Sequence, residues 1–348
     1  MAFLTDQIPA TGVNLTDLFH IVDPNDLSQN PAGSSYKATI QQVIGALTGG
    51  TSVMVLSTGI GSVERCGNNN DAIGDYSTVS GGYNNTSLGL SSVIGGGSGN
   101  TVSGYFGFDT IGGGLCNSMS GSGINTIGGG GYNTILGCFS GTISGGLLNT
   151  VSGYNFYQTI GGGTLNTTLS GSFSTIGGGS YNIVSGDGAT VGGGGGACPS
   201  YGNQALGSNS TVGGGGSNTS SGIGSTIAGG GGNTSSDYFS TIGGGLLNIS
   251  NSENSTVSGG RYNTIGTLSS SYSVVGQTIG GGNCNTISSY SGVYTNGGST
   301  ISGGYCNTTV SSYYGGQTIA GGWCNITSSD YSTVGGGYCN TSSGQGST

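Results

Sequence analysis

The sequence is poor in charged side chains, above all in positive ones. Of its 348 residues, three are Lys or Arg and twelve are Asp or Glu, which gives a net charge of −9. The three cations, Lys37, Arg65 and Arg261, lie far apart along the chain. Binding a nucleic-acid backbone requires several basic side chains on one face. The composition therefore excludes a nucleic-acid-binding protein.

Groups that perform acid–base or metal chemistry are also scarce. His20 is the only histidine, and the repeated part of the chain has no paired carboxylates for general acid–base catalysis. A Ser or Thr nucleophile would have no base to activate it. The eight cysteines form no Cys-x-x-Cys pair, which argues against zinc. We therefore expect no enzyme, no cofactor and no bound metal ion.

Two further kinds of ligand motif are missing. Asp109, Asp187, Asp237 and Asp330 are isolated and lack the Gly-Gly-x-Gly-x-Asp pattern of calcium-binding solenoids. The glycine run at 192–196 is not followed by Gly-Lys-[Ser/Thr] and opens no helix, so it is not a phosphate-binding loop.

Segments that would direct the chain to a membrane are not evident. The first residues contain neither a basic nor a long apolar segment, so we expect no secretory signal. The longest apolar stretch, around 52–56, is far too short to span a bilayer. The sequence thus predicts a soluble protein that is made in the cytosol.

Glycine is the most conspicuous residue that is present, with 82 copies. Gly and Pro together reach a level at which disorder is suspected. Disordered chains, however, usually combine high charge, many prolines and few aromatics. This chain has 4 Pro, 19 Tyr and 8 Phe. The composition therefore favours an ordered, tightly stacked backbone.

The first fifty residues differ from the rest and predict a small α+β domain. A β-rich run over 18–22 ends in a turn at 23–26, and a second strand is expected over 34–38. Thr39 fits an N-cap, with Gln42 completing a capping box. Apolar residues at helical spacing then predict a short helix, on Ile40, Val43, Ile44 and Leu47. We assign 1–50 to this domain and 51–76 to a linker.

From residue 77 the chain repeats a unit of the form Thr-[Ile/Val]-[Gly/Ser/Ala]-Gly-Gly-x-x-Asn. The pattern places the first residues of sixteen units at Thr78, Ser92, Thr110, Thr126, Thr142, Thr159, Thr175, Thr190, Thr211, Thr226, Thr241, Thr256, Thr278, Thr300, Thr318 and Thr333. The Asn follows at a nearly constant distance, at Asn85, Asn117, Asn133, Asn149, Asn166, Asn182, Asn218, Asn233, Asn248, Asn263, Asn285, Asn307, Asn325 and Asn340. Asn100 comes one residue late, and Asn203 is displaced by an insert near residue 198. Repeats of this regularity decide the architecture.

Each unit reads as one coil of an all-β parallel β-solenoid, or β-roll. The Thr-Ile half predicts a short strand with Ile or Val inward, and a second strand follows the Asn. The glycines suit a corner with positive φ or close backbone approach, and the Asn suits αL geometry and a hydrogen-bonded ladder. One or two buried residues per coil cannot offset its ordering entropy. We therefore expect stacking into a rod on the order of 75 Å, stabilised by lateral association of several chains.

Five cysteines occupy one position of the unit: Cys116, Cys284, Cys306, Cys324 and Cys339. The last four belong to consecutive coils and should stack at a spacing that permits disulfides. Other units have Leu or Tyr at this position, which favours the interpretation of Cys as a small buried hydrophobic residue.

Aromatic side chains cluster in the segments of variable length. They are Tyr105, Phe106, Phe108, Tyr154, Phe156, Tyr157, Tyr238, Phe239, Tyr290, Tyr294, Tyr313 and Tyr314. Tyr-, Ser- and Gly-rich loops make adaptable contact surfaces, and flat rings suit carbohydrate. The alternative, which we favour, is that the rings pack between neighbouring chains or cap the edges of coils.

Ser-Thr-Val-Ser-Gly-Gly-Tyr-Asn-Asn-Thr at 77–86 resembles the head repeats of trimeric autotransporter adhesins, and similar repeats occur in phage tail-fibre proteins. The resemblance covers about 77–348 and implies a trimeric left-handed parallel β-roll. The segments 17–23 and 33–40 resemble the start of virion-attached phage fibres.

The two families imply different ends. An autotransporter adhesin needs a secretory signal and a membrane-anchoring barrel, which we do not find, whereas phage release by lysis needs no signal. The last residues stop where another unit would begin, so we expect a longer protein.

The leading hypothesis is a homotrimeric phage fibre with no nucleic-acid partner and no membrane insertion. It is assembled in the host cytoplasm and located in the virion. Its N-terminus docks to a tail, neck or baseplate, and a distal region contacts a host glycan or protein. The candidate docking residues are Phe19, His20, Ile21, Tyr36, Ile40, Val43, Ile44 and Leu47.

Two alternatives remain open. One is a bacterial surface adhesin or extracellular filament. The other is an ice-binding solenoid, suggested by the aligned Thr residues, although loops of uneven length argue against a flat ice-binding face.

Overall fold

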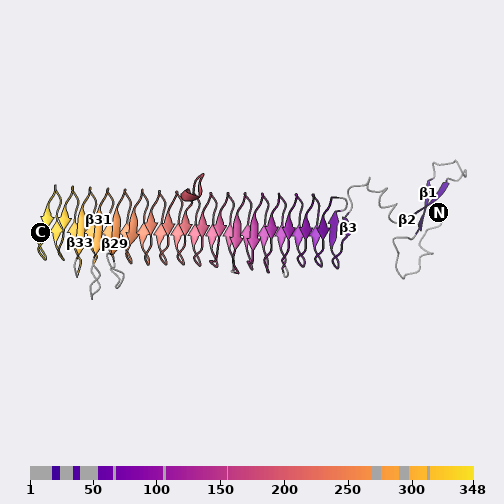
Figure 1. Cartoon of the computed structure of the whole chain (residues 1–348), viewed down its shortest axis with the longest axis horizontal. Helices are drawn as coiled ribbons and strands as arrows, with labels where there is room; N and C mark the ends of the chain where they lie inside the picture. The colour runs from indigo at the N-terminus through magenta and orange to yellow at the C-terminus, as the bar shows by residue number, and fades with distance from the viewer. Residues whose placement is uncertain are drawn as a thin grey trace.

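The computed structural model describes residues 18–23, 34–39, 54–65, 68–104, 107–154, 156–267, 276–289, 298–311 and 314–348. For 18–23 and 34–39 it describes the backbone alone. From residue 54 onward the described chain forms a long, straight rod of stacked coils (Figure 1). The model is all-β, and the prediction of a parallel β-solenoid of about sixteen coils is confirmed.

The N-terminal segment contains an antiparallel pair of strands, β1 (Leu18–Asp23) and β2 (Ser34–Thr39). The two strands pair along their whole length, from Leu18 opposite Thr39 to Asp23 opposite Ser34. Both strands that the sequence predicts here are therefore confirmed. The helix predicted on Ile40, Val43, Ile44 and Leu47 lies outside the described residues.

Each coil contributes two short strands, one to each of two parallel sheets. The first sheet contains β4 (Val63–Arg65), β6 (Thr78–Val79), β8 (Val93–Ile94), β10 (Thr110–Ile111), β12 (Thr126–Ile127), β14 (Thr142–Ile143), β16 (Thr159–Ile160), β18 (Thr175–Ile176), β20 (Thr190–Val191), β22 (Thr211–Val212), β24 (Thr226–Ile227), β26 (Thr241–Ile242), β28 (Thr256–Val257), β30 (Thr278–Ile279), β32 (Thr300–Ile301), β34 (Thr318–Ile319) and β36 (Thr333–Val334).

The second sheet is built from the strands that follow the Asn of each coil. These are β5 (Asp71–Ala72), β7 (Thr86–Ser87), β9 (Thr101–Val102), β11 (Ser118–Met119), β13 (Thr134–Leu136), β15 (Thr150–Ser152), β17 (Thr167–Thr168), β19 (Ile183–Val184), β21 (Gln204–Ala205), β23 (Thr219–Ser220), β25 (Thr234–Ser235), β27 (Ile249–Asn251), β29 (Thr264–Thr267), β31 (Thr286–Ser289), β33 (Thr308–Ser311), β35 (Ile326–Thr327) and β37 (Thr341–Ser342).

The core is a column of side chains enclosed between the two sheets. In the first sheet the second residue of each strand points inward, and Ile111, Ile127 and Ile143 are fully buried. These residues lie directly opposite one another from coil to coil. Since successive side chains of a strand alternate between faces, the preceding Thr lies on the outer face. The predicted inward position of Ile or Val is thus confirmed.

The stack begins before residue 77, in the range that the sequence pattern assigns to a linker. Strand β4 pairs in parallel with β6, and β5 pairs with β7. Strand β3 (Met54–Leu56) then pairs antiparallel with β4 along the first edge of the sheet. Glu64 occupies the inward position of this first coil, opposite Val79. The repeat pattern does not detect this first coil, because the coil has the carboxylate of Glu64 at the inward position where the repeat has Ile or Val.

One repeat boundary also needs correction. Val93, and not Ser92, lies opposite Thr78 and Thr110. Counted from Val93, Asn100 is at the ordinary distance and is not displaced. Ser92 belongs instead to a buried column of residues that precede the strand.

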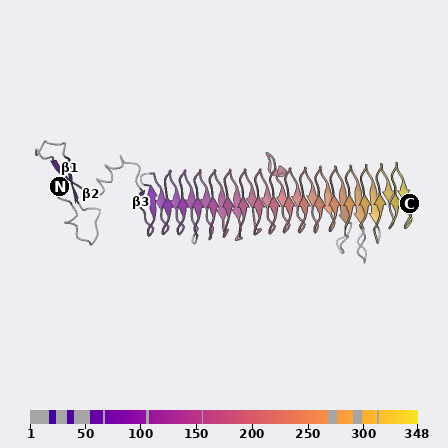
Figure 2. The same cartoon turned by 180° about the vertical axis from the view of Figure 1, so that it is seen from behind.

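The rod has one even edge and one uneven edge. The even edge carries the Gly-Gly corners, and the uneven edge carries the connections after the second strands (Figures 1 and 2). The exception on the even edge is the insert near residue 198, which forms a protruding 3₁₀ helix, η2 (Pro199–Tyr201). Because the variable length is confined to the edges, the register of both sheets continues past every insert.

Candidate functional site

A buried ladder of asparagine side chains runs along the even edge of the rod. Asn149 is representative. Its Nδ2 donates to Asn133 Oδ1 at 3.1 Å, Gly145 O at 3.1 Å and Gly163 O at 3.0 Å. Its Oδ1 accepts hydrogen bonds from the backbone N and the Nδ2 of Asn166, both at 3.1 Å. Each Asn therefore joins its own coil to the coils before and after it.

The ladder includes every Asn that the repeat predicts. It is also longer than predicted, because it starts at Asn70, whose Oδ1 accepts from the backbone N of Asn85. The two apparent exceptions have their places in it: Asn100 donates to Asn85 Oδ1, and the backbone N of Asn203 donates to Asn182 Oδ1. The insert before Asn203 is therefore accommodated without breaking the ladder.

The left-handed backbone conformation belongs to the residue before the ladder Asn in every coil except that of Asn203, where Gly202 has φ −63°, so the αL assignment of the Asn itself is wrong. Leu148 has φ 56° and Cys284 has φ 58°, whereas neither Asn149 nor Asn285 has positive φ. The Asn is needed for its side-chain hydrogen bonds and not for its backbone tolerance.

A second buried column lies on the uneven side, directly before the first strands, and it is polar in all coils of the repeat except those that have Gly141 or Ala189 at this position. In many coils it is a Ser that pairs with an inward Ser of the same coil, such as Ser240 Oγ with Ser235 Oγ at 2.7 Å. In one coil it is Asp109, which is 1% exposed. Its Oδ1 accepts from the backbone N and Nδ2 of Asn125, both at 3.0 Å, whereas its Oδ2 has no hydrogen-bond partner. Burial raises the pKa of Asp109, and the two hydrogen bonds from Asn125 oppose this in part.

Three other acidic side chains act as caps between coils. Asp75, Asp187 and Asp330 each accept a hydrogen bond from the backbone N–H of the residue fifteen positions earlier, at 2.8, 2.8 and 3.1 Å. Among the described residues, no group of three or more His, Cys, Asp or Glu side chains is arranged to hold a metal ion.

The cysteine column lies at the surface, so the interpretation of these residues as buried hydrophobic side chains is wrong. Cys116, Cys284, Cys306 and Cys324 are partly exposed, Cys339 is exposed, and all five are free thiols. They share the left-handed φ of their column, between 52° and 58°. Among the cysteines that the structure describes, the buried one is Cys138, which belongs to the core and which the repeat pattern did not single out.

Aromatic rings stack on rings of neighbouring coils within the chain. Phe139 lies 5.0 Å from Phe156 between ring centroids, and Tyr157 lies 5.3 Å from Phe173. On the even edge Trp323 lies 4.8 Å from Tyr305 and 6.1 Å from Tyr338. The two phenyl-ring pairs are stacked, with interplanar angles of 17° and 23°, whereas the rings around Trp323 are tilted by 44° and 46°.

The remaining predicted surface residues fall into three groups. The side chains of Phe108, Tyr154, Phe156, Tyr157, Tyr238, Phe239 and Tyr314 are exposed. Tyr105, Phe106, Tyr290, Tyr294 and Tyr313 lie outside the described residues. Of the docking candidates, Phe19, His20 and Ile21 are in β1 and Tyr36 is in β2, with Ile21 opposite Tyr36.

The glycines of the corner fall into two columns with different explanations. Gly163 has φ +90°, and a Cβ added to it would lie 2.0 Å from Gly179 O of the next coil. Stacking therefore requires glycine there. The preceding position is also glycine in all sixteen repeats, yet at several of these an added Cβ would meet nothing within 4 Å and φ is not positive: Gly129, Gly145, Gly178, Gly193, Gly214, Gly229 and Gly303. At these seven positions nothing in the described chain requires glycine, whereas φ values of 135–157° favour glycine at six other positions of the same outer column: Gly96, Gly162, Gly244, Gly281, Gly321 and Gly336.

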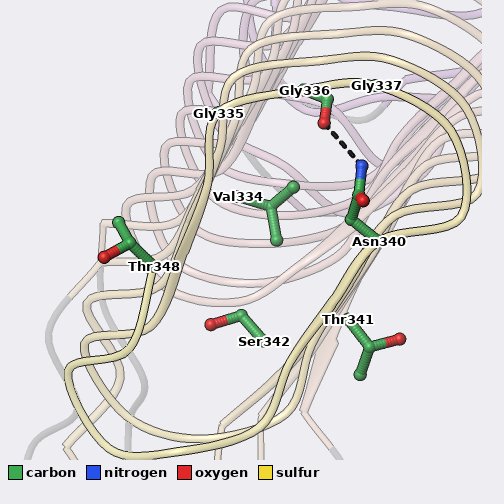
Figure 3. A pocket seen from close by; sticks show the side chains of 8 residues that line it. All are labelled: Val334, Gly335, Gly336, Gly337, Asn340, Thr341, Ser342 and Thr348. Carbon is green, nitrogen blue, oxygen red and sulfur yellow. Dashed lines mark hydrogen bonds between the residues drawn. The ribbon is translucent and has the colours of Figure 1, made fainter.

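The last coil has an open end face with a hollow of about 490 Å³ (Figure 3). Val334 and Ser342 point into it, and Asn340 Nδ2 donates to Gly336 O at 2.8 Å. In the coil before, Asn325 Nδ2 also donates to Gly337 O of the following coil. The hollow is thus the space that a neighbouring coil fills elsewhere along the rod, and not a ligand pocket.

No protein-family model matches this chain, and no curated protein is similar to it in sequence. In the part of the chain that the structure describes, no helix has the length and apolar character needed to span a membrane.

Proposed function

We propose that this chain is a structural fibre of a phage or phage-like particle. Residues 1–50 would dock it to a tail, neck or baseplate, and the solenoid is a stiff shaft that projects toward a host surface. The observation that carries the proposal is the unbroken register of both sheets together with the buried Asn ladder. Each rung is hydrogen bonded to both neighbours, so the rod resists bending and keeps its two ends apart, as a spacer must.

The proposal includes three chains that associate side by side. Its support is the part of the outer glycine column, including Gly129, Gly178 and Gly214, where neither positive φ nor a close neighbour in the same chain requires glycine. Beside it runs a seam of exposed apolar residues, including Leu115, Leu147, Leu148, Leu246 and Leu247. A backbone free of side chains allows close approach of another backbone, and apolar area buried alongside it stabilises the contact at about 25 cal/mol per Å².

The test of association replaces three outer glycines, in the variant Gly129→Gln, Gly178→Gln, Gly214→Gln. The matched control places Gln at Ser221, an exposed position on the uneven edge. Sedimentation velocity should show a trimer for the native chain and the control, and a monomer with unchanged circular dichroism for the triple variant. A native monomer, or a triple variant that stays trimeric, would refute lateral association through this strip.

The test of docking deletes residues 1–50. The shortened chain should give the same rods in electron micrographs but should no longer co-purify with the particles that carry the native chain. Continued co-purification would show that the hairpin segment does not dock. Long end-to-end polymers that form without any particle would favour the alternative of an extracellular filament or surface adhesin.

A further inference from the structure

Four thiols stand in consecutive coils at one corner of the rod. Each of these cysteines follows a residue that is paired in parallel with its counterpart in a neighbouring coil. The pairs are Asn283 with Tyr305, Tyr305 with Trp323, and Trp323 with Tyr338, and the cysteines that follow are Cys284, Cys306, Cys324 and Cys339. The backbone N of each Cys also donates to the preceding coil, at 2.8–2.9 Å. We name this set the thiol column.

The thiol column has no role in the core of the fold. Its members are exposed or partly exposed, and they occupy a left-handed conformation that a residue with a Cβ adopts at some cost. Other coils hold Asn84, Ser217 or Gly232 at the same position. Four successive cysteines at such a position therefore call for an explanation outside the packing of one coil.

The stacking of the coils brings the Cα atoms of neighbouring cysteines within the range that a disulfide spans. Neighbouring rungs are about 4.8 Å apart, inside the range of about 4.4–6.8 Å that disulfides span between Cα atoms. The four residues have nearly the same φ, 54–58°, so their Cα–Cβ bonds point the same way. The Cβ atoms of a disulfide lie about 3.5–4.5 Å apart, so a bridge needs the corner to close by only a few tenths of an ångström.

The thiols influence one another along the whole column. Burial raises the pKa of the Cys306 thiol and Cys284 raises it further, whereas hydrogen bonds with Tyr305 and Cys324 lower it. Burial likewise raises the pKa of the Cys324 thiol, with Cys339 the larger and Cys306 the smaller further cause. The raised pKa values keep these thiols protonated at neutral pH, which slows oxidation.

We propose that the thiol column is a site of covalent cross-linking, in which Cys284 bonds to Cys306 and Cys324 bonds to Cys339. This pairing uses all four sulfurs, whereas a central bridge between Cys306 and Cys324 would leave two without a neighbour. The oxidant is a small disulfide such as oxidised glutathione. For each bridge, two S–H bonds break and one S–S bond forms, while the oxidant gains two electrons and two protons and leaves as two thiols.

The first bridge would join the coil of Cys284 to the coil of Cys306, and the second would join the coil of Cys324 to the coil of Cys339. A chain made in a reducing cytosol keeps the thiols free while its coils stack, and exposure to an oxidising exterior then closes the bridges. The cross-linking itself does not depend on the fibre being part of a phage.

The experiment treats the full-length chain with oxidised glutathione, blocks remaining thiols with iodoacetamide and digests without reduction. Chymotrypsin cleaves after Tyr305, Trp323 and Tyr338, so the cysteines separate into different peptides for mass spectrometry. We expect two cross-linked pairs, 284 with 306 and 324 with 339, that form faster as the pH rises. Cys116 is the matched control, since it occupies the same column between Gly99 and Tyr132 and should stay unbridged.

Two variants make the result decisive. Cys306→Ser should abolish the first bridge and keep the second, while Cys116→Ser should change neither. Oxidation should slow thermolysin cleavage within 276–348 at least tenfold in the native chain, and not in the double variant Cys306→Ser, Cys324→Ser. Mixed disulfides with glutathione on all four cysteines, a 306–324 bridge, or bridges between chains on a non-reducing gel would each overturn the proposal.

Discussion

Removal of one ladder side chain, in Asn149→Ala, should destabilise the rod strongly. The native side chain donates three hydrogen bonds and accepts two, and it is fully buried. A hydrogen bond contributes about 0.5–1.5 kcal/mol net, and a buried group left without a partner costs about 1–3 kcal/mol. Asn166 would lose the acceptor of its backbone N–H, so the expected loss is about 4–6 kcal/mol.

The loss should be local, because a solenoid is stabilised by contacts between neighbouring repeats. Hydrogen exchange followed by mass spectrometry should show faster exchange of the Asn166 amide and of the coils on both sides. The urea midpoint should fall as well. Asn251→Ala is the matched control, since Asn251 is exposed and accepts a single bond from Ser236 Oγ at 3.0 Å; its effect should stay within about 0.5 kcal/mol.

The reasoning fails if Asn149→Ala has the urea midpoint of the control and keeps the Asn166 amide protected. That result would mean that water or a shift of the corner replaces the lost bonds, and that the ladder is not a main source of stability.

Three further predictions concern the corner glycines and the buried polar column. Gly163→Ala should lower the urea midpoint strongly, because its Cβ would meet Gly179 O. Gly178→Ala should leave the stability of the coil nearly unchanged, because its Cβ would meet no atom. Equal effects of the two variants would contradict the distinction between the two glycine columns. Because the pKa of Asp109 is raised in the folded rod, its carboxyl group stabilises the fold fully at low pH, and this contribution is lost as the pH rises through the folded pKa. Asp109→Asn should therefore be more stable than the native chain at pH 7 and less dependent on pH in urea titrations, and a steeper dependence would be inconsistent with a carboxyl group whose pKa is raised by burial. Ser235→Val alone should be destabilising, since it removes one of the two partners of Ser240 Oγ, which also donates to Asp237 O at 2.8 Å. Adding Ser240→Ala should restore stability, as the coil at 175–189 has Val and Ala at these positions. Additive effects would argue against a coupled pair.

The sequence alone was enough to predict the repeated coil, its two strands, the inward Ile or Val and the Asn ladder. These features repeat sixteen times at nearly constant spacing. Stacking the units as coils is the arrangement that buries the Ile or Val of every unit. The two strands of the N-terminal segment were predictable for a simpler reason. Each is a β-rich run next to a turn signal, and such signals act within a few residues.

Only the tertiary structure decided which side of the corner each residue faces. The thiol column was expected to be buried, but the residue before the ladder Asn turns outward because its left-handed backbone points its side chain away from the core. The coil that contains Glu64 was hidden because its core position is polar, and its place is visible only through its pairing with β6. The sequence pattern marks Asp109 only as an isolated acidic residue, yet it is buried, since the residue before the first strand of its coil turns into the space between the sheets. Local sequence determines how one coil bends, whereas burial depends on the coils stacked above and below it.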